Sequence, residues 1–430
     1  MIEMKKRITS SEALAKKENT KVILAGWAAH VKSMGKIAFV TLRDRDNQIQ
    51  LITTNKNLIK QISKITKESV ILISGKIKKS KLKSGKNEIE LSEIEVLSLA
   101  DASLPIDISG KIETDLSKRL DWRWIDLRTR KNLLIFKVLS KFLQASRDFF
   151  IKNGLIELCS PKLIAYPSEG GGEEFALPYF GRKAYLAQSP QFYKQMAQAA
   201  GFEGVFEIAP VFRANPSHTS RHDTEYTSLD LEISWVDDEE LRQFEEKWLV
   251  YVLKEIKTEF GKEIKKTFNV EINIPKIPFP RITMSEALKI VTGGKTDLDS
   301  EGEKKLGDYI LKKYKTDFAF ITEFPWSIRP FYHMRPENKK LTKSFDMIYK
   351  GIELTTGANR EHRYNILVEQ AKEKGLSLNS IEFYLNFFKY GCPPHSGLGL
   401  SPTRFVMQLL ELGNVREATF APRDTERLVP

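Results

Sequence analysis

Residues 21 to about 100 carry short runs in which apolar and polar positions alternate, as in half-buried strands. In one run, Ala38, Val40 and Leu42 share a side and predict a core face, while Phe39 points the other way. Asp46-Asn47 separates two runs and indicates a hairpin turn. The predicted strands are 22–27, 36–43, 48–53, 69–75 and 88–97. Five strands in so short a segment predict a small closed barrel of the OB-fold type.

The pattern changes to a helical period beyond residue 130. A helix is predicted from Lys131 to Asn153, because its apolar positions form one stripe and Gly154 occupies the C-terminal cap position. The basic, proline-containing segment 105–130 before it is predicted to be a hinge. Irregularly alternating strands and helices follow, beginning with a strand at 155–158 that stops at Pro161. We therefore expect an α+β protein with three parts: a barrel at 1–104, a hinge at 105–130 and a larger domain at 131–430.

The net charge indicates a class of binding partner, and the cysteine content indicates a cellular compartment. The 430 residues carry a net charge of +12, which favours a polyanionic partner such as nucleic acid, although a lysine-rich source would give the same balance. Two cysteines without a CxxC pair, no secretory signal and no membrane-spanning apolar run indicate a cytoplasmic protein. Six lysines cluster at the turn between the last two barrel strands: Lys76, Lys78, Lys79, Lys81, Lys83 and Lys86. They are expected to lie beside the nucleic-acid groove of an OB-fold, and the alternative is a solvated loop.

The segment 205–235 is the first candidate for chemistry. Two strands, 205–213 and 228–235, each have one apolar side, and if they pair, the other side carries Arg213, Asp230 and Glu232. The connecting loop adds cations and an aromatic side chain: His218, Arg221, His222 and Tyr226. Arginines that grip phosphate oxygens and an aromatic ring that stacks on a base suit a nucleoside triphosphate. The alternative is a sheet with one solvated face.

Two further segments add to this site. A turn at Lys350-Gly351 would place Ile348 opposite Glu353 and bring Asp346 within roughly 7 Å of Glu353 on the same face. Two carboxylates at that separation suit Mg²⁺ bound to ATP phosphates. The second segment is GLGLSPTRF, in which glycines precede Arg404 at a predicted strand-to-helix turn, again an arrangement that suits phosphate.

Taken together, these segments resemble motifs 1, 2 and 3 of the class II aminoacyl-tRNA synthetases. Motif 1 is the long helix followed by the strand and Pro161; motif 2 is FRANPSHTSRHDTEYTSLDLE; motif 3 is GLGLSPTRF. The N-terminal barrel resembles the subgroup for aspartate, asparagine and lysine, and the segments QSPQFYKQM and TTGANREHR resemble aspartyl enzymes of the archaeal and eukaryotic type. The resemblance implies an aspartate–tRNA ligase that uses ATP and Mg²⁺ and forms a homodimer through the motif 1 helix, with no membrane association.

The same resemblance implies a role for each matching residue. The aspartate side chain would be held by Lys194 and Arg360, and its ammonium by Gln191 and Asp230, under a loop carrying Glu169. The nucleotide would be held by Arg213, Arg221, His222, Tyr226, Glu353 and Arg404, with Arg213 on the α-phosphate and Tyr226 on adenine. Magnesium ligands would be Asp346 and Glu353, with Thr356 nearby. Anticodon readers would be Phe39, Gln50 and Glu88. Arg213, Arg404, Lys194 and Arg360 would be the catalytic group.

Some positions depart from the family pattern. Asn215 stands where the family usually has an acidic residue, and Asn359 stands where it usually has Gln. Around motif 3, Ser396 and Ser401-Pro402-Thr403 stand where glycine and acidic residues are more usual. Ala29 stands near a position where enzymes restricted to aspartate tRNA tend to have tryptophan, which favours charging of both tRNA-Asp and tRNA-Asn. The alternatives are an asparaginyl-tRNA synthetase, which Lys194 opposes, a catalytically silent RNA-binding relative, and a tRNA-independent enzyme that makes a small molecule through an acyl-adenylate.

Overall fold

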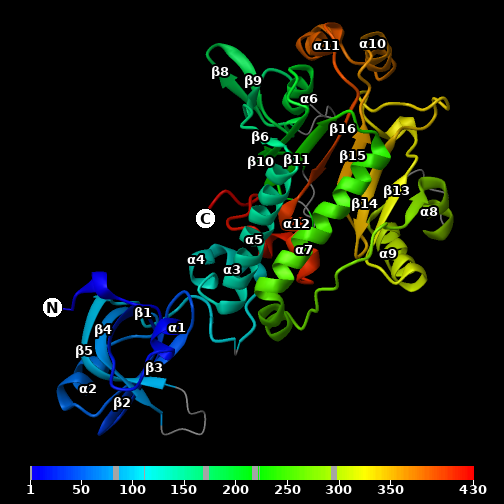
Figure 1. The fold of residues 1–430 in the computed structure, drawn as a ribbon. Coiled ribbons are helices and arrows are strands. Elements are labelled where there is room, and N and C mark those ends of the chain that lie inside the picture. The colour runs from blue at the N-terminus through cyan, green and yellow to red at the C-terminus, as the bar shows by residue number, and fades with distance from the viewer. Residues whose placement is uncertain are drawn as a thin grey trace. The chain divides into compact units, whose positions relative to one another are not determined.

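The computed structural model describes residues 2–80, 87–110, 112–167, 174–215, 221, 223–291 and 298–430. The chain divides into two compact units, residues 1–107 and 108–430, which are coloured from blue to red along the chain in Figure 1. Among the described residues, no helix combines the length and the apolar character needed to cross a bilayer.

The first unit is a closed five-stranded barrel with the strand order β1-β2-β3-β5-β4, which confirms the predicted fold. As predicted, Ala38, Val40 and Leu42 are buried in its core and Phe39 lies on the opposite side of β2. Phe39 was expected to be exposed and is half-buried. The elements are η1 Met4–Lys6, α1 Ser10–Leu14, β1 Lys21–Met34, β2 Ile37–Arg43, β3 Gln48–Thr53, α2 Lys56–Ile62, β4 Val70–Lys79 and β5 Asn87–Ser98.

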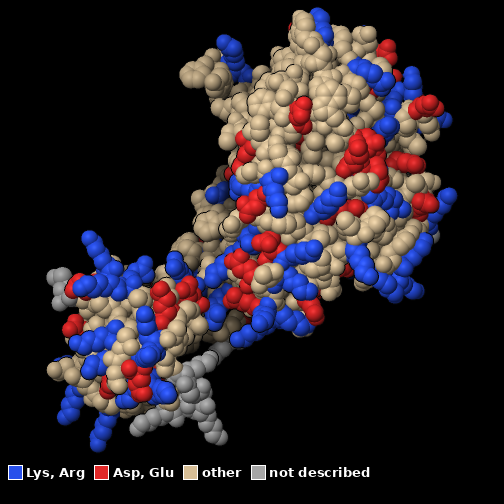
Figure 2. Space-filling view, in the orientation of Figure 1, with Lys and Arg blue, Asp and Glu red and all other residues tan. Residues whose placement is uncertain are grey.

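Positive charge is concentrated in the barrel unit. Its 107 residues hold 20 Lys and Arg against 12 Asp and Glu, a net +8 out of +12 for the whole chain. Figure 2 shows basic side chains over much of the visible face of this unit. This distribution gives the barrel the electrostatic character of a nucleic-acid-binding module.

The second unit is built on a mixed sheet of eight strands in the order β12-β13-β14-β15-β16-β11-β10-β6. Its end pairs, β12 with β13 and β10 with β6, are parallel and the central pairs are antiparallel. The strands are β6 Ile156–Glu157, β10 Gly204–Phe212, β11 Glu225–Ser234, β12 Arg281–Thr283, β13 Phe318–Thr322, β14 Ser344–Tyr349, β15 Ile352–Asn359 and β16 His395–Leu400. A small second sheet contains β7 Leu163–Ile164, β8 Ala176–Tyr179 and β9 Arg182–Leu186.

The helices α5, α7 and α12 cover one face of the large sheet, and the site lies on the other face. The long helices α5 and α7 lie side by side across the sheet (Figure 1), and Trp248 of α7 packs among the aromatic side chains Phe142 and Phe150 of α5. The helices are α3 Leu116–Asp121, α4 Arg123–Asp126, α5 Arg130–Lys152, α6 Gln191–Ala199, α7 Asp238–Phe268, α8 Met284–Val291, α9 Ser300–Tyr314, η2 Trp326–Ile328, α10 Tyr364–Glu373, η3 Leu378–Ile381, α11 Glu382–Lys389, α12 Pro402–Leu409 and η4 Val415–Glu417.

Most expected elements are present, and some differ from the prediction in detail. The predicted helix 131–153 is α5 within one residue at each end, and Gly154 follows it with φ +84°. The strand expected at 155–158 shrinks to the two residues of β6. Trp235, expected at the apolar end of a strand, lies past the end of β11 with φ +65° and is 64% exposed.

The predicted hinge segment contains two short helices, α3 and α4. The buried guanidinium of Arg123 in α4 donates hydrogen bonds to the carbonyl oxygens of Thr419 at 2.7 Å, Glu417 at 3.1 Å and Phe420 at 3.1 Å. This part of the segment is therefore tied to the C-terminal end of its own unit. The hinge role of residues 105–130 stays a prediction.

Candidate active site

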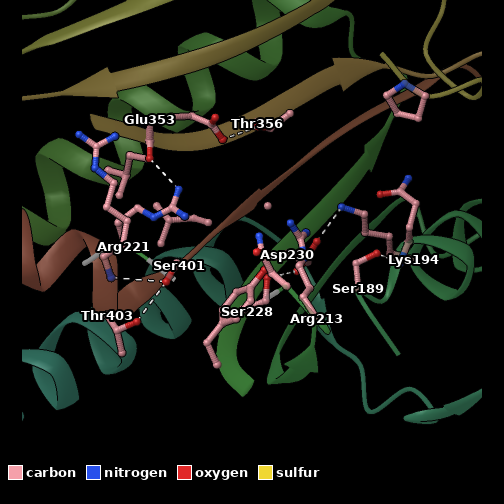
Figure 3. A pocket seen from close by; sticks show the side chains of 18 of the residues that line it. Ser189, Lys194, Arg213, Arg221, Ser228, Asp230, Glu353, Thr356, Ser401 and Thr403 are labelled. Atoms are coloured by element: carbon pink, nitrogen blue, oxygen red, sulfur yellow. Dashed lines mark hydrogen bonds and ion pairs between the residues drawn. The ribbon is translucent and has the colours of Figure 1, made fainter. Parts of the chain in front are cut away.

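A cavity of about 380 Å³ lies over the strands β11, β15 and β16, on the sheet face that carries polar side chains. It is shown from close by in Figure 3. Side chains from α6, β11, β15 and α12 converge on it because alternate residues of each strand point to one face. Ten of the residues singled out from the sequence line it: Gln191, Lys194, Arg213, Arg221, Tyr226, Asp230, Glu353, Thr356, Arg360 and Arg404.

A buried group of charges forms one end of this cavity. The Lys194 ammonium lies 3.0 Å from Oδ1 of Asp230 and 3.4 Å from Oε2 of Glu232, and it donates to the Leu398 carbonyl at 3.1 Å. Arg360 reaches the same Glu232 through Nε at 2.8 Å. All four charged side chains are at least 94% buried. Although burial opposes ionisation, Arg360 and Lys194 together hold the pKa of Glu232 below its usual value.

The glycines of β16 make room for these carboxylates. A Cβ on Gly397 would lie 1.8 Å from Oε2 of Glu232, and one on Gly399 would lie 3.0 Å from Oδ1 of Asp230. The Gly-x-Gly spacing therefore follows the alternation of the neighbouring strand β11. The sequence suggested that these glycines accommodate phosphate, and this interpretation of Gly397 is wrong because its side-chain position is filled by Glu232.

A layer of neutral hydrogen bonds supports the charged group. His395 has its Nδ1 2.7 Å from the Pro393 carbonyl, which can only accept, so Nε2 accepts from the Gln195 amide at 3.0 Å. Gln195 in turn accepts from Tyr384 at 2.9 Å and from Gln191 at 2.8 Å. Burial lowers the pKa of His395 to about 4, so the ring is neutral. These contacts fix the position of α6, which carries Gln191 and Lys194.

The opposite end of the cavity is rich in arginine. The Arg213 guanidinium lies 5.8 Å from the centre of the Tyr226 ring, and Arg404 donates to the Glu353 carbonyl at 3.0 Å. Nε of Arg404 is buried and has no hydrogen-bond partner among the described residues. Arg221 pairs with Glu303 of α9 at 2.6 Å. Several guanidinium groups around a polar cavity suit an extended polyanion such as a triphosphate.

The expected carboxylate pair forms through a hairpin, with one difference from the simple register. The turn at Lys350-Gly351 places Ile348 opposite Glu353 as predicted, but a bulge after Met347 puts Thr356 opposite Asp346. Thr356 therefore shares a face with Glu353 and donates to its Oε1 at 2.8 Å. The bulge explains how Glu353 and Thr356, three residues apart, reach one site.

Asp346 lies just outside the main cavity. It lines an adjoining cavity of about 100 Å³ together with Glu303, Glu353 and Arg329, and Arg329 pairs with its Oδ2 at 2.6 Å. Burial raises the pKa of Asp346 to about 7, opposed by Arg329 and reinforced by the charge of Glu353. Within the described ranges, no group of three or more His, Cys, Asp or Glu side chains is arranged to hold a metal ion by itself.

Comparison with known proteins places the chain in a family. The family described as tRNA synthetases class II (D, K and N) matches residues 115–425, and the one described as OB-fold nucleic acid binding domain matches residues 22–97. The chain belongs to the class II tRNA synthetases of the aspartate, lysine and asparagine group. Its two compact units correspond to these two matches.

Individual relatives cover the whole chain. It is 44% identical to the aspartate–tRNA(Asp) ligase of Pyrococcus abyssi, over 98% of this chain and 99% of that protein. It is 42% identical to the aspartate–tRNA(Asp/Asn) ligase of Methanopyrus kandleri, over 99% of this chain and 100% of that protein. Among solved structures, asparaginyl-tRNA synthetase from Pyrococcus horikoshii with asparaginyl-adenylate superposes with a TM-score of 0.91 at 30% identity, covering 100% of both chains.

Two of the positions expected to depart from the synthetase pattern are in contact with each other. Asn359 of β15 lies directly opposite Ser396 of β16, and its amide donates to the Ser396 hydroxyl at 2.8 Å. The Ser396 hydroxyl donates to the Val236 carbonyl at 2.9 Å. Both side chains are buried, so each supplies a partner that the other needs. Ser401 caps α12 through the Arg404 amide at 3.4 Å and lies 3.1 Å from the Thr403 hydroxyl.

Other predicted residues of the synthetase lie in the barrel or outside the described residues. The Gln50 amide donates to Glu88 at 3.4 Å, so two of the expected anticodon readers lie together. The third, Phe39, is half-buried on the neighbouring strand β2, where Thr41 pairs with Gln50. Glu169, His218, His222, Lys81, Lys83 and Lys86 lie outside the described residues.

Some of the lining residues were missed by sequence reasoning. Arg329 and Glu303 reach the site from segments with no motif of their own, and Glu303 sits in a helix that looks like an ordinary solvated one. His333 lines the main cavity beside Arg360, but burial lowers its pKa well below the usual range, so it is neutral. The sequence offered no signal for Glu303.

Proposed function

We propose that this synthetase is an aspartate–tRNA ligase. It activates L-aspartate with ATP to aspartyl-adenylate, releases pyrophosphate and transfers aspartate to the 3′ end of tRNA-Asp. The observation that carries the proposal is the buried end of the cavity, where Lys194 and Arg360 both approach Glu232. The names of the relatives above support the same reaction.

Selection of an acid over its amide follows from these two cations. A carboxylate placed between Lys194 and Arg360 gains two charge-assisted hydrogen bonds, whereas a neutral amide offers the Lys194 ammonium no charge in place of Asp230. Asp230 and Gln191 would bind the substrate ammonium. Lys194 would then lose its ion pair with Asp230 and form one with the substrate side-chain carboxylate. This exchange opposes the asparaginyl alternative, although a solved asparaginyl enzyme shares the fold.

The activation step is one of positioning and charge stabilisation. The aspartate α-carboxylate attacks the α-phosphorus in line, and pyrophosphate leaves. Arg213 would hold the α-phosphate, Arg221, His222 and Arg404 the outer phosphates, and Tyr226 the adenine ring. Guanidinium groups already in place stabilise the charge that develops on the phosphate oxygens. Glu169 would belong to the loop that closes over aspartate.

Magnesium fits the carboxylate pair. Oδ1 of Asp346 is buried and accepts no hydrogen bond from the described residues, so it is available to a cation. Asp346 and Glu353, with Thr356 beside them, supply the oxygen ligands that Mg²⁺ takes alongside phosphate oxygens and water. Bound there, Mg²⁺ would neutralise phosphate charge.

The barrel would bind the tRNA anticodon through Phe39, Gln50 and Glu88, and its positive charge would attract the phosphate backbone. We further propose that tRNA-Asn is charged as well as tRNA-Asp, from the resemblance at Ala29, which is buried beside the bulge in β1. By resemblance to the family, the proposal includes a homodimer through the motif 1 helix α5. From the sequence, it includes a cytoplasmic location and a hinge in 105–130 between domains 1–104 and 131–430.

The test is charging of labelled aspartate onto tRNA-Asp and tRNA-Asn transcripts, side by side, with ATP and Mg²⁺. Comparable charging of both is the expected result, and charging of tRNA-Asp alone would overturn only the wider tRNA range. Pyrophosphate exchange is measured in parallel with aspartate and with asparagine. Exchange that depends on asparagine instead of aspartate would establish the asparaginyl alternative, and no charging with either amino acid would contradict the ligase activity.

A further inference from the structure

Glu303 places an additional carboxylate next to the arginine-rich end of the cavity. It lies in the first turn of α9, whose N-cap is Asp299, and its Oε2 is 2.6 Å from a terminal nitrogen of Arg221. The two side chains are 13% and 19% exposed, so the pair is shielded from bulk water. Arg221 is also one of the residues proposed to hold the outer phosphates of ATP.

Two glycines allow α9 to approach this end of the site. A Cβ on Gly307 would lie 2.5 Å from Cα of Gly351, the glycine in the β14–β15 turn, where φ is +74°. The close contact brings the first turn of α9 against the start of β15. Burial raises the pKa of Glu303, and the nearby negative charge of Glu353 raises it further, which reflects the short separation of the two carboxylates.

The space between these groups is suited to a hydrated cation. Glu303, Glu353 and Asp346 line the cavity of about 100 Å³, and Arg329 lines it as well. Arg329 occupies only Oδ2 of Asp346, whose side chain is 90% buried, and Oδ1 is left without a hydrogen bond from the described residues. A buried carboxylate oxygen without a partner beside two further carboxylates favours a positive charge or its water ligands.

The charges make nucleotide binding and ion binding interdependent. In the nucleotide-free protein, Arg221 neutralises Glu303. A triphosphate that takes Arg221 leaves Glu303 facing Glu353, Asp346 and the phosphate oxygens, all of the same sign. A divalent cation between them removes this repulsion.

We propose that Glu303 is a positioning residue that couples ATP binding to the divalent ion: it holds Arg221 before ATP binds and then faces the water shell of the ion near Asp346 and Glu353. This inference rests on the proposed function, because it assumes that the arginine-rich end of the cavity takes the ATP phosphates. It assigns to α9 a role that no motif of the sequence indicates.

The experiment compares ATP binding by calorimetry in EDTA and in saturating Mg²⁺, using the full-length wild-type protein and Glu303→Gln. We expect Glu303→Gln to bind ATP at least about fivefold more tightly than the wild type in EDTA, so that the gain in affinity on adding Mg²⁺ shrinks by a similar factor. Complexation of Mg²⁺ by ATP itself is common to both proteins and cancels in the comparison. Glu301→Gln is the matched control, because Glu301 lies in the same turn, is 74% exposed and pairs with Lys305.

An equal Mg²⁺ gain in wild type and Glu303→Gln would overturn the inference while leaving the proposed function intact. Wild-type protein that binds no ATP under either condition would overturn both. Thermal unfolding is measured for every variant, and Glu303→Ala serves as a second neutral variant if Glu303→Gln is unstable. Glu303→Asp, which keeps the charge, should restore most of the wild-type Mg²⁺ gain, and a merely structural role of Glu303 would not produce that rescue.

Discussion

The ammonium of Lys194 lies 3.0 Å from the carboxylate of Asp230, and both side chains are almost fully buried. The pair joins α6 to β11 at the end of the cavity proposed to take the aspartate side chain. When a ligand binds, each of these two buried charges can form an ion pair with a ligand group of opposite charge instead of with its present partner. An amino acid with its own ammonium and side-chain carboxylate supplies one such group to each.

Replacing Lys194 by Met should therefore impair aspartate binding selectively. We expect kcat/KM for aspartate in pyrophosphate exchange to fall roughly 10²- to 10³-fold, since a buried charge partner is lost, with KM for ATP nearly unchanged. Lys183→Met, at an exposed position of β9, is the control. Because Asp230 and Glu232 lose a partner, thermal unfolding is measured alongside. A folded Lys194→Met with wild-type aspartate kinetics would exclude Lys194 from the amino acid site.

Phe39→Ala should weaken tRNA binding without affecting amino acid activation. Loss of one stacking platform costs about 1–3 kcal/mol, so the Kd for tRNA-Asp should rise about tenfold or more. Filter binding measures the Kd, and pyrophosphate exchange, which does not need tRNA, is the internal control. Unchanged tRNA affinity would show that this half-buried ring serves the barrel instead of the anticodon.

His395 should make the protein less stable in acid. Its pKa is about 4 in the folded state, because burial disfavours the charged ring, and about 6.5 when unfolded. The unfolded chain therefore takes up a proton that the folded protein refuses, and stability is lost as pH falls from about 6.5 to 4. Urea unfolding of wild type and His395→Asn should diverge over this range by on the order of 3 kcal/mol. His30→Asn, at an exposed site, should follow the wild type; parallel curves for His395→Asn would contradict the assignment.

The Asn359–Ser396 hydrogen bond should appear as a coupling energy. Asn359→Ala and Ser396→Ala are each expected to lower the free energy of unfolding by about 1–2 kcal/mol, since each leaves a buried polar group unsatisfied. The double variant should cost about 1 kcal/mol less than the sum. Combining Asn359→Ala with Thr258→Ala, an exposed position on α7, gives an additive control. Additivity in the 359/396 cycle would mean that the two departures from the family pattern are independent.

Much of the fold was predictable because its signals are local. The alternation around Phe39 defined the buried side of β2, and the helical period with Gly154 defined α5 to within one residue. The limits of short edge elements were not predictable, since β6 is only two residues long and depends on pairing with β10. Trp235 was assigned to a strand by its apolar character, but the chain turns there with a positive φ.

Many residues that line the candidate site were predictable, but their contacts were not. The turn at Lys350-Gly351 indicated that Asp346 and Glu353 would meet, whereas the bulge that adds Thr356 follows from strand pairing alone. The glycines of motif 3 suggested phosphate, yet Gly397 makes room for Glu232 on a strand more than 160 residues earlier.

The sequence by itself determined the N-terminal barrel and the α+β character of the rest, the polar and apolar faces of the strands, and many of the residue types at the site. These are encoded by periodicity and by residue chemistry within short segments. Tertiary structure alone decided that Glu303 meets Arg221, that Lys194 and Arg360 share Glu232, and that Asn359 meets Ser396. Such contacts join segments far apart in the chain, and they form only when burial of the whole core fixes how strands and helices pack.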